Sequence, residues 1–427
     1  MQDPLDIGDN SPEAVIVLPA RGTGGSSRLK IPFSRCVGAA WVAVWVFNSP
    51  GTVIAQTLAE FQTPYYVIHT DLEADDAREA GIRMTRMFEA YRTRTQGFSG
   101  EIPDRFQFYL YKSKADYLKA GGPPGSAGVF SGSILMATAG GAVSPKTWQV
   151  IQHEGFHQFA KSVIRGDLPT WLNEGMAEYF SHGLFTGDSY YTGLISPEYL
   201  ARLQDAMKGK RTKSFNQLMA ISHDQWNQKL VRENYDQAWS IVHYLVHGED
   251  GRHQAAFAKY IEALGKGQPA AKAWRQAGLP EVNKLEQQWN AWWLAQPPNP
   301  TADQYTEAYA RTFASYLARA AGQHQSFNSF DQFAKAARSG KVRTAAIRNG
   351  LPADSWLPPR LLSDDIEAAT NSGVRWSIQT APSGGRGVMA DCPDGARVTA
   401  SCVFKIGEPA EVTGKIIAGG ASKSRGN

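Results

Sequence analysis

Cysteine is scarce in this sequence, with three residues among 427 and none in a zinc-finger spacing. Blocks of one charge sign are also lacking, because 44 basic and 40 acidic side chains are interspersed and leave a formal net charge of only +4. These absences argue against a cysteine-based metal domain and against a nucleic-acid-binding protein. The hydrophobic fraction of 42% and the length predict a globular protein of two or three domains.

Apolar runs long enough to span a bilayer comfortably are missing near the N-terminus. The apolar stretch Cys36–Phe47 follows basic residues and precedes the helix-breaking segment Asn48–Gly51. Val53 and Ala55 then occupy the −3 and −1 positions of a cleavage site. We therefore predict an export signal in residues 1–55 and a periplasmic or extracellular protein without a stable membrane span. An uncleaved membrane anchor is the alternative.

Export would expose the cysteines that remain after signal cleavage to an oxidising compartment. After signal cleavage Cys392 and Cys402 remain, and they flank the turn signal Pro393–Gly395. We expect a disulfide that closes this small loop in an oxidising compartment. Two reduced, partly buried thiols are the alternative.

The sequence does contain the pattern H-E-x-x-H, as His153-Glu154-Gly155-Phe156-His157. Two imidazoles four residues apart lie one above the other on a helix, so both can bind one Zn²⁺ ion. Glu154 is about 100° around the helix from His153, close enough to take a proton from a metal-bound water. The pattern predicts a metal site with a general base. Surface histidines with an incidental glutamate are the alternative.

The flanking residues predict a helix around this motif. Ser144 can cap the helix, and Pro145 suits its first position. Apolar residues recur at mixed helical spacing over residues 147–164, and Arg165-Gly166 supplies a stop signal. The motif therefore falls in the middle of a helix.

A catalytic zinc ion needs a third protein ligand and one open position. A second predicted helix, from Trp171 to about His182, offers Glu174 and Glu178 on one face. Spacing alone does not say which of the two binds metal. One can serve as ligand while the other orients a ligand histidine, and ordinary solvated glutamates are the alternative.

These segments resemble the gluzincin metallopeptidases. The resemblance rests on H-E-G-F-H-Q-F at residues 153–159 and W-L-N-E-G-M-A-E-Y at residues 171–179. It is strongest for the peptidase-MA-like branch and extends to the catalytic cores of aminopeptidase N and thermolysin-like enzymes. It implies a Zn²⁺ cofactor with three protein ligands: His153, His157 and Glu174.

The resemblance also implies roles for the neighbouring acids. Glu154 would be the general base, and Glu178 would occupy the position of an acid that supports the zinc ligands in thermolysin-like enzymes. One departure is the gap between His157 and Glu174, which is a couple of residues shorter than in the aminopeptidases. The shorter gap shortens the connecting loop without removing a ligand.

Residues 234–245 are similar to a later helix of the same family. A tyrosine near the start of that helix stabilises the oxyanion in aminopeptidase relatives, and this role would fall to Tyr235. Packing against neighbours on its own helix is the alternative. His243 and His247 are also four residues apart but have no acid in the H-E-x-x-H register, so we expect partly exposed helix residues rather than a second metal site.

The predicted fold class is α+β. The resemblance implies a zincin-like core in which a small N-terminal sheet packs against a mostly helical C-terminal subdomain. Periodicity predicts strands at 65–69, 105–111, 130–138, 374–380, 396–405 and 410–418, and helices at 72–93, 115–119, 253–264, 281–295, 302–320 and 328–338. By resemblance, Gly132–Ala137 would be an edge strand that binds a peptide backbone, and an interior strand is the alternative.

The domain boundaries follow from these elements and from the linker Pro297–Pro300. We predict an export segment, a sheet-bearing part, a helical zinc-binding part and an accessory C-terminal region with a disordered tail: residues 1–55, 56–143, 144–296 and 301–427. The predicted function is an exported zinc peptidase acting on a peptide or protein substrate. A zinc hydrolase of non-protein or cell-wall amides and a catalytically inactive envelope-binding protein are the alternatives.

Overall fold

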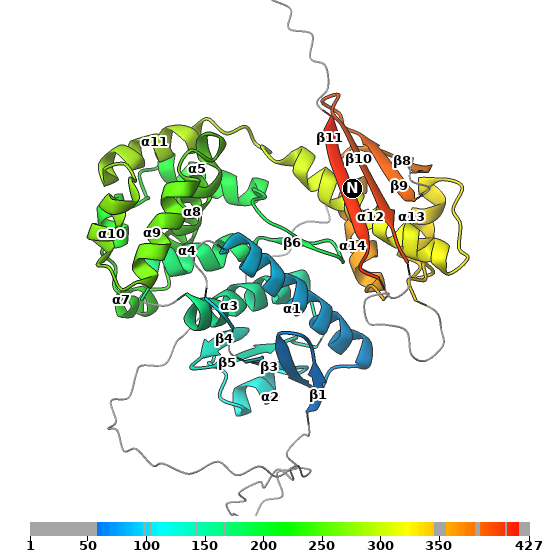
Figure 1. Ribbon diagram of the computed structural model, residues 1–427, viewed down its shortest axis with the longest axis horizontal. Helices are drawn as coiled ribbons and strands as arrows, with labels where there is room; N and C mark the ends of the chain where they lie inside the picture. The colour runs from blue at the N-terminus through cyan, green and yellow to red at the C-terminus, as the bar shows by residue number, and fades with distance from the viewer. Residues whose placement is uncertain are drawn as a thin grey trace, which may run out of the picture.

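The structure is a computed structural model that describes residues 58–96, 100–102, 104–141, 143–164, 167–345, 356–380, 385–405 and 408–417. The predicted export signal in residues 1–55 and the predicted disordered tail from Gly419 onward lie outside these residues. None of the described helices has the length and apolarity that a membrane crossing requires. The architecture is mixed, with a small N-terminal sheet, a helical middle and a second sheet near the C-terminus, which confirms the α+β prediction (Figure 1).

The N-terminal sheet has five strands in the order β1-β2-β3-β5-β4. Their bounds are Ala59–Gln62, Tyr66–Thr70, Phe106–Tyr111, Gly128–Ser131 and Ile134–Thr138 for β1 to β5. The central strands β2, β3 and β5 are parallel, and the edge strands β1 and β4 are antiparallel to their neighbours. Alternate residues of β2 and β3 are buried, as expected for strands with one covered face.

One strand prediction was wrong in detail. The predicted strand at residues 130–138 is a hairpin, because Gly132 has a φ of +66° and turns the chain between β4 and β5. Within the segment Gly132–Ala137, residues from Ile134 onward belong to β5, which pairs with strands on both sides. The edge strand is β4 instead, so the interior-strand alternative holds for most of the segment.

Two long helices cover one face of this sheet: α1 (Ala74–Arg94) and α3 (Pro145–Val163). Phe88 of α1 packs on Phe106 of β3 and on Phe159 of α3. The N-terminus of α3 is a capping box, in which the Ser144 hydroxyl accepts from Thr147 N. The short helix α2 (Lys114–Lys119) lies on the other side of the sheet. The cap fixes the first residue of α3, and the H-E-x-x-H motif therefore falls in the middle of this helix.

The middle of the chain is helical. Its elements are α4 (Thr170–Ser181), the hairpin β6 (Leu184–Phe185) and β7 (Tyr190–Tyr191), α5 (Pro197–Lys208), α6 (Phe215–Met219), α7 (His223–Gln228), α8 (Arg232–Gly251), α9 (Gln254–Gly265), α10 (Ala270–Ala277) and α11 (Val282–Leu294). Trp289 and Trp293 of α11 are buried and donate their indole N–H groups to the hydroxyl and the carbonyl oxygen of Ser240. These tryptophans pack α11 against α8.

The described residues of the C-terminal module form three helices and a four-stranded antiparallel sheet in the order β11-β10-β9-β8. Its elements are α12 (Ala302–Gly322), α13 (Phe330–Arg338), α14 (Pro359–Thr370), β8 (Arg375–Thr380), β9 (Arg386–Asp391), β10 (Arg397–Val403) and β11 (Glu411–Ile417). The sequence indicated neither β9 nor α14. A buried ion pair of 2.6 Å between Arg319 of α12 and Asp188 of the β6–β7 turn joins this module to the helical part.

The expected disulfide between Cys392 and Cys402 was wrong, because both are free thiols. Cys392 lies at the β9–β10 turn, where its N–H donates to Ala396 O. Cys402 pairs with Arg386 at the other end of the same hairpin. The antiparallel register therefore holds the two cysteines at opposite ends of the ladder, too far apart for a disulfide.

Candidate metal centre

Three buried side chains from α3 and α4 place their donor atoms together: His153, His157 and Glu174. The Nε2 atoms of the two histidines are 3.1 Å apart, and Glu174 Oε2 lies 3.4 Å and 3.5 Å from them. In a tetrahedral zinc site with bonds of about 2.0–2.1 Å, neighbouring ligand atoms are roughly 3.3–3.4 Å apart. The three separations therefore fit one face of a zinc coordination tetrahedron.

Close packing of α4 against α8 contributes to this arrangement. Glycine follows Glu174 in the chain, and a Cβ atom on Gly175 would lie 2.5 Å from the carbonyl oxygen of Ala238 in α8. Gly155 is similarly enclosed, because its Cβ would lie 2.7 Å from Met87 of α1. Gly175 lets α8 approach α4 closely, and Gly155 lets α1 approach α3. No other residue would fit at position 175 without moving backbone.

Glu178 supports one of the histidines. Its Oε1 lies 3.0 Å from His153 Nδ1, on the side of the ring away from Glu174, and its Oε2 lies 3.7 Å from His182 Nε2. The structure thus gives the two glutamates different places: Glu174 at the Nε2 atoms and Glu178 at Nδ1. A carboxylate on Nδ1 fixes the orientation of an imidazole that binds metal through Nε2.

The electrostatics of the group favour a cation. Burial acts to raise the pKa of Glu174. The positive charges of the two histidines and their hydrogen bonds to Glu174 outweigh this effect, so the pKa lies well below its usual value. Burial acts to lower the pKa of His153, but hydrogen bonds to Glu174 and Glu178 and their charges raise it well above its usual value. The carboxylates of Glu174, which is buried, and Glu178, which is partly buried, therefore favour positive charge at this point, and a divalent cation could provide it.

Glu154 is completely buried beside the group. Its Oε2 accepts a hydrogen bond of 2.8 Å from the backbone N–H of Phe130 in β4, and its Oε1 is buried without a hydrogen-bond partner. One carboxylate oxygen is thus held by the sheet while the other remains available. Sequence reasoning did not find this contact, since nothing in the local pattern links residue 130 to residue 154.

Tyr235 also lies near the group. Its ring centroid is 6.3 Å from that of His153, and it packs edge-on against Trp226 at 5.1 Å. Burial raises the pKa of Tyr235, and the charges of Glu174, Glu178 and Glu154 add to the rise. The phenol therefore keeps its proton and can donate a hydrogen bond near the metal group. The two rings that contact Tyr235 belong to α3 and α7.

The expectation for the pair His243 and His247 was wrong for one residue. His243 is buried and its Nε2 lies 3.1 Å from Gly193 O, whereas His247 is partly exposed and contacts the Tyr179 hydroxyl at 2.8 Å. Burial lowers the pKa of His243 to about 3 and that of His247 to about 4. Both rings serve as neutral hydrogen-bonding groups between α8 and its neighbours.

Sequence reasoning also missed Gln158, the residue after the motif. Its side-chain amide donates to Gln107 O of β3 at 3.0 Å and to Ser133 O in the β4–β5 turn at 2.9 Å. Gln158 thereby attaches α3 to the sheet one turn from Glu154. The signal that could have found it is a buried-face glutamine in an otherwise apolar part of the helix.

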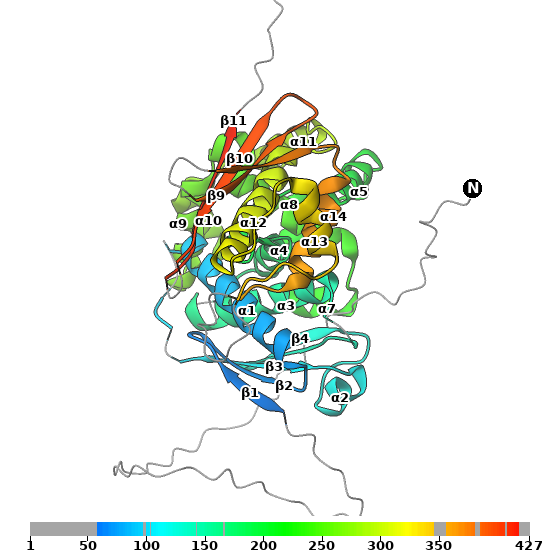
Figure 2. The ribbon, with the colours of Figure 1, turned by 90° about the vertical axis from the view of Figure 1, so that its right-hand side faces the viewer.

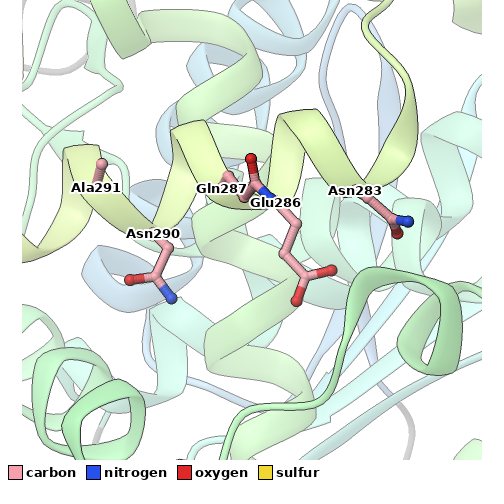
Figure 3. Close-up of a pocket in the computed structure, with 5 residues that line it drawn as sticks. All are labelled: Asn283, Glu286, Gln287, Asn290 and Ala291. Carbon is pink, nitrogen blue, oxygen red and sulfur yellow. The ribbon is translucent and has the colours of Figure 1, made fainter.

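A polar groove on α11 is separate from the candidate metal centre. It runs along α11 and is lined by Asn283, Glu286, Gln287, Asn290 and Ala291 (Figure 3). Glu286 already accepts from Phe215 N, and Asn283 from the side chain of Asn216. These contacts give the groove a structural role in holding α6 against α11.

A family model matches the region that contains the candidate metal centre. A family model described as "Protein of unknown function (DUF1570)" matches residues 148–271, which include the H-E-x-x-H motif, both glutamates of α4 and Tyr235. The match covers less than a third of the chain. No curated protein matches the sequence.

Proposed function

We propose that this protein is an exported zinc-dependent peptidase of the gluzincin type. The proposal rests on a buried triangle of donor atoms, with sides of 3.1–3.5 Å, formed by His153 Nε2, His157 Nε2 and Glu174 Oε2. The carboxylate of Glu154 lies beside this triangle and is not part of it. Two imidazoles and one carboxylate form a ligand set found in catalytic zinc sites. The resemblance to gluzincins and the motif-based export signal point the same way.

When bound, a zinc ion would polarise a carbonyl group and acidify water at this point. The protein supplies the remaining chemistry. Glu154 would take the proton of the attacking water on its free Oε1 and pass it to the amine that leaves. The hydrogen bond from Phe130 N keeps the carboxylate in place during both transfers. A binding protein with a purely structural metal would have no use for a buried base here.

An extended peptide substrate would bind along the edge strand β4. Phe130 N–H points to Glu154 rather than to β5, so its carbonyl oxygen also faces away from β5. A peptide that runs along β4 would donate a backbone N–H to this oxygen. Its next peptide bonds would then lie beside Glu154. This assignment replaces the segment Gly132–Ala137 that the resemblance suggested.

Substitution of Tyr235 by phenylalanine tests the oxyanion role. We expect Tyr235→Phe to lower kcat roughly 10²–10³-fold with little change in KM, because a donor to developing negative charge acts mainly in the transition state. Zinc content and melting temperature should stay at wild-type values. Tyr309→Phe, in the C-terminal module, is the matched control and should leave both constants unchanged. A normal kcat for Tyr235→Phe would show that Tyr235 only packs against Trp226.

The function itself is tested with the purified full-length chain and an unbiased peptide mixture. We expect about one zinc ion per chain, cleavage that a chelator stops, and recovery on addition of Zn²⁺. Mass spectrometry of the products separates removal of terminal residues from internal cleavage. Zinc without any peptide cleavage would favour an amide substrate outside proteins, and a protein that binds no zinc would overturn the proposal.

A further inference from the structure

The edge strand β4 runs alongside helix α3, and both views place the two elements together (Figure 1, Figure 2). A Cβ atom on Gly128 would lie 2.7 Å from Val150 Cγ1 in α3. Two residues further along the strand, Phe130 N lies 2.8 Å from Oε2 of Glu154, which is one helical turn beyond Val150. Two strand residues and four helix residues both advance by roughly 6–7 Å, so β4 follows α3 as far as the proposed base.

Phe130 differs from its neighbours in β4. Residues i and i+2 of a strand share a face, so Phe130 extends from the same face as Gly128, the one that α3 covers. Val129 points to the opposite face and is buried with Tyr111 and Tyr117. The Phe130 side chain is partly exposed, and among the described residues it joins none of the buried hydrophobic clusters. A large apolar side chain beside the proposed base is therefore open to contact from a ligand.

A second aromatic side chain borders the metal group from α8. Tyr235 is partly exposed, and its ring centroid is 6.3 Å from that of His153. Trp226 supports it, because this tryptophan is buried and packs edge-on against Tyr235 at 5.1 Å. Partly exposed aromatic side chains thus border the group from the strand and from the helical part of the chain.

The strand side of the site carries no charged residue of its own. Lysine, arginine, aspartate and glutamate are all absent between Lys119 and Lys146, a stretch that includes β4, β5 and the turn between them. The acid that reaches β4 is Glu154 of α3, which is completely buried and held by Phe130 N. A charged substrate side chain would therefore lose hydration beside Phe130 without gaining a partner on the strand, whereas an apolar one would be stabilised by burial.

We propose that Phe130 is a specificity-determining residue, which selects peptides with a large apolar side chain next to the scissile bond. A peptide that pairs with β4 through Phe130 O extends the sheet by one strand. Side chains of neighbouring strands that share a face lie side by side, so a substrate side chain on the α3 face would cover the Phe130 ring. The inference rests on the peptidase function proposed above and adds a substrate class to it.

The experiment uses the full-length protein and a peptide that it cleaves in the unbiased mixture. The peptide is resynthesised with phenylalanine, leucine, alanine, lysine or glutamate at each of the two positions that flank the cleaved bond, and kcat/KM is measured for each version. We expect phenylalanine or leucine at one position to give values roughly 10–100-fold above the other three, as an apolar pocket does. Phe130→Ala should make the phenylalanine and alanine peptides similar, because the ring is lost while the backbone N–H that holds Glu154 stays.

Zinc content and melting temperature show whether each variant is folded. Phe130→Thr is a second truncation, with a side chain that suits a strand, and should lose the preference as Phe130→Ala does. Phe327→Ala removes a partly exposed phenylalanine of the C-terminal module and is the matched control, which should keep the wild-type preference.

The outcomes separate this inference from the peptidase function. Equal cleavage of all versions by the wild type, a preference for lysine or glutamate, or an unchanged preference in Phe130→Ala would overturn the inference and leave the peptidase function standing. An equal loss for every peptide in both truncations would also overturn it, because Phe130 would then only support the fold. Cleavage of no peptide at all would overturn the proposed function and this inference with it.

Discussion

Glu154→Gln is expected to bind zinc as the wild type does and to lose peptide hydrolysis by roughly 10²–10⁴-fold, the usual contribution of a general base. The amide oxygen of glutamine can still accept the hydrogen bond from Phe130 N, so the side chain should keep its position. It cannot take a proton from water. Loss of activity with retained metal is therefore the specific signature of a base rather than of a ligand.

The measurement combines single-turnover cleavage of a peptide with metal analysis of the same sample. Glu198→Gln is the matched control, because Glu198 is an exposed glutamate of α5 whose partner is Arg202. It should have normal activity. If Glu154→Gln cleaved peptides at the wild-type rate, the proposed role of Glu154 would be wrong, even with zinc in place.

His153→Ala is expected to purify with little or no zinc. The change removes one of three donor atoms and leaves Glu178 without the imidazole that it holds at 3.0 Å. Loss of a group that merely supports a ligand costs about 10–100-fold in metal affinity, so loss of a ligand should cost more than roughly 100-fold. Both the zinc content and the hydrolysis of peptides should disappear together.

Thermal unfolding gives an independent readout. Added Zn²⁺ should raise the melting temperature of the chelator-treated wild type and leave that of His153→Ala unchanged, because a ligand stabilises only a protein that binds it. His223→Ala, an exposed histidine of α7, is the matched control and should respond as the wild type does. An equal zinc response in His153→Ala would show that the metal binds elsewhere.

The sequence by itself determined the local part of the candidate site. The cap at Ser144 and helical periodicity predict a helix that begins at Pro145 and ends near Ile164, and α3 has these bounds to within two residues. His153 and His157 lie one turn apart on this helix. The same reasoning places Glu174 and Glu178 on one face of a second helix. Such inferences succeed because the rotation per residue of a helix is set by its backbone, whatever lies around it.

Contacts between distant segments were decided only by the tertiary structure. Spacing did not say which glutamate of α4 faces the Nε2 atoms, and it gave no sign that β4 reaches Glu154. It also suggested a disulfide that the register of β9 and β10 rules out. Local patterns place side chains around one helix or strand but carry no distance between elements.

Interhelical distance depends on which side chains meet at the contact. At Gly175 the absence of a Cβ atom lets α8 approach α4, and this brings Tyr235 to the metal group. The docking of the C-terminal module brings α14 and α12 together with α1 and α3 around one cavity. The sequence therefore determined the donor residues and their helices, whereas packing decided which of them meet and what surrounds them.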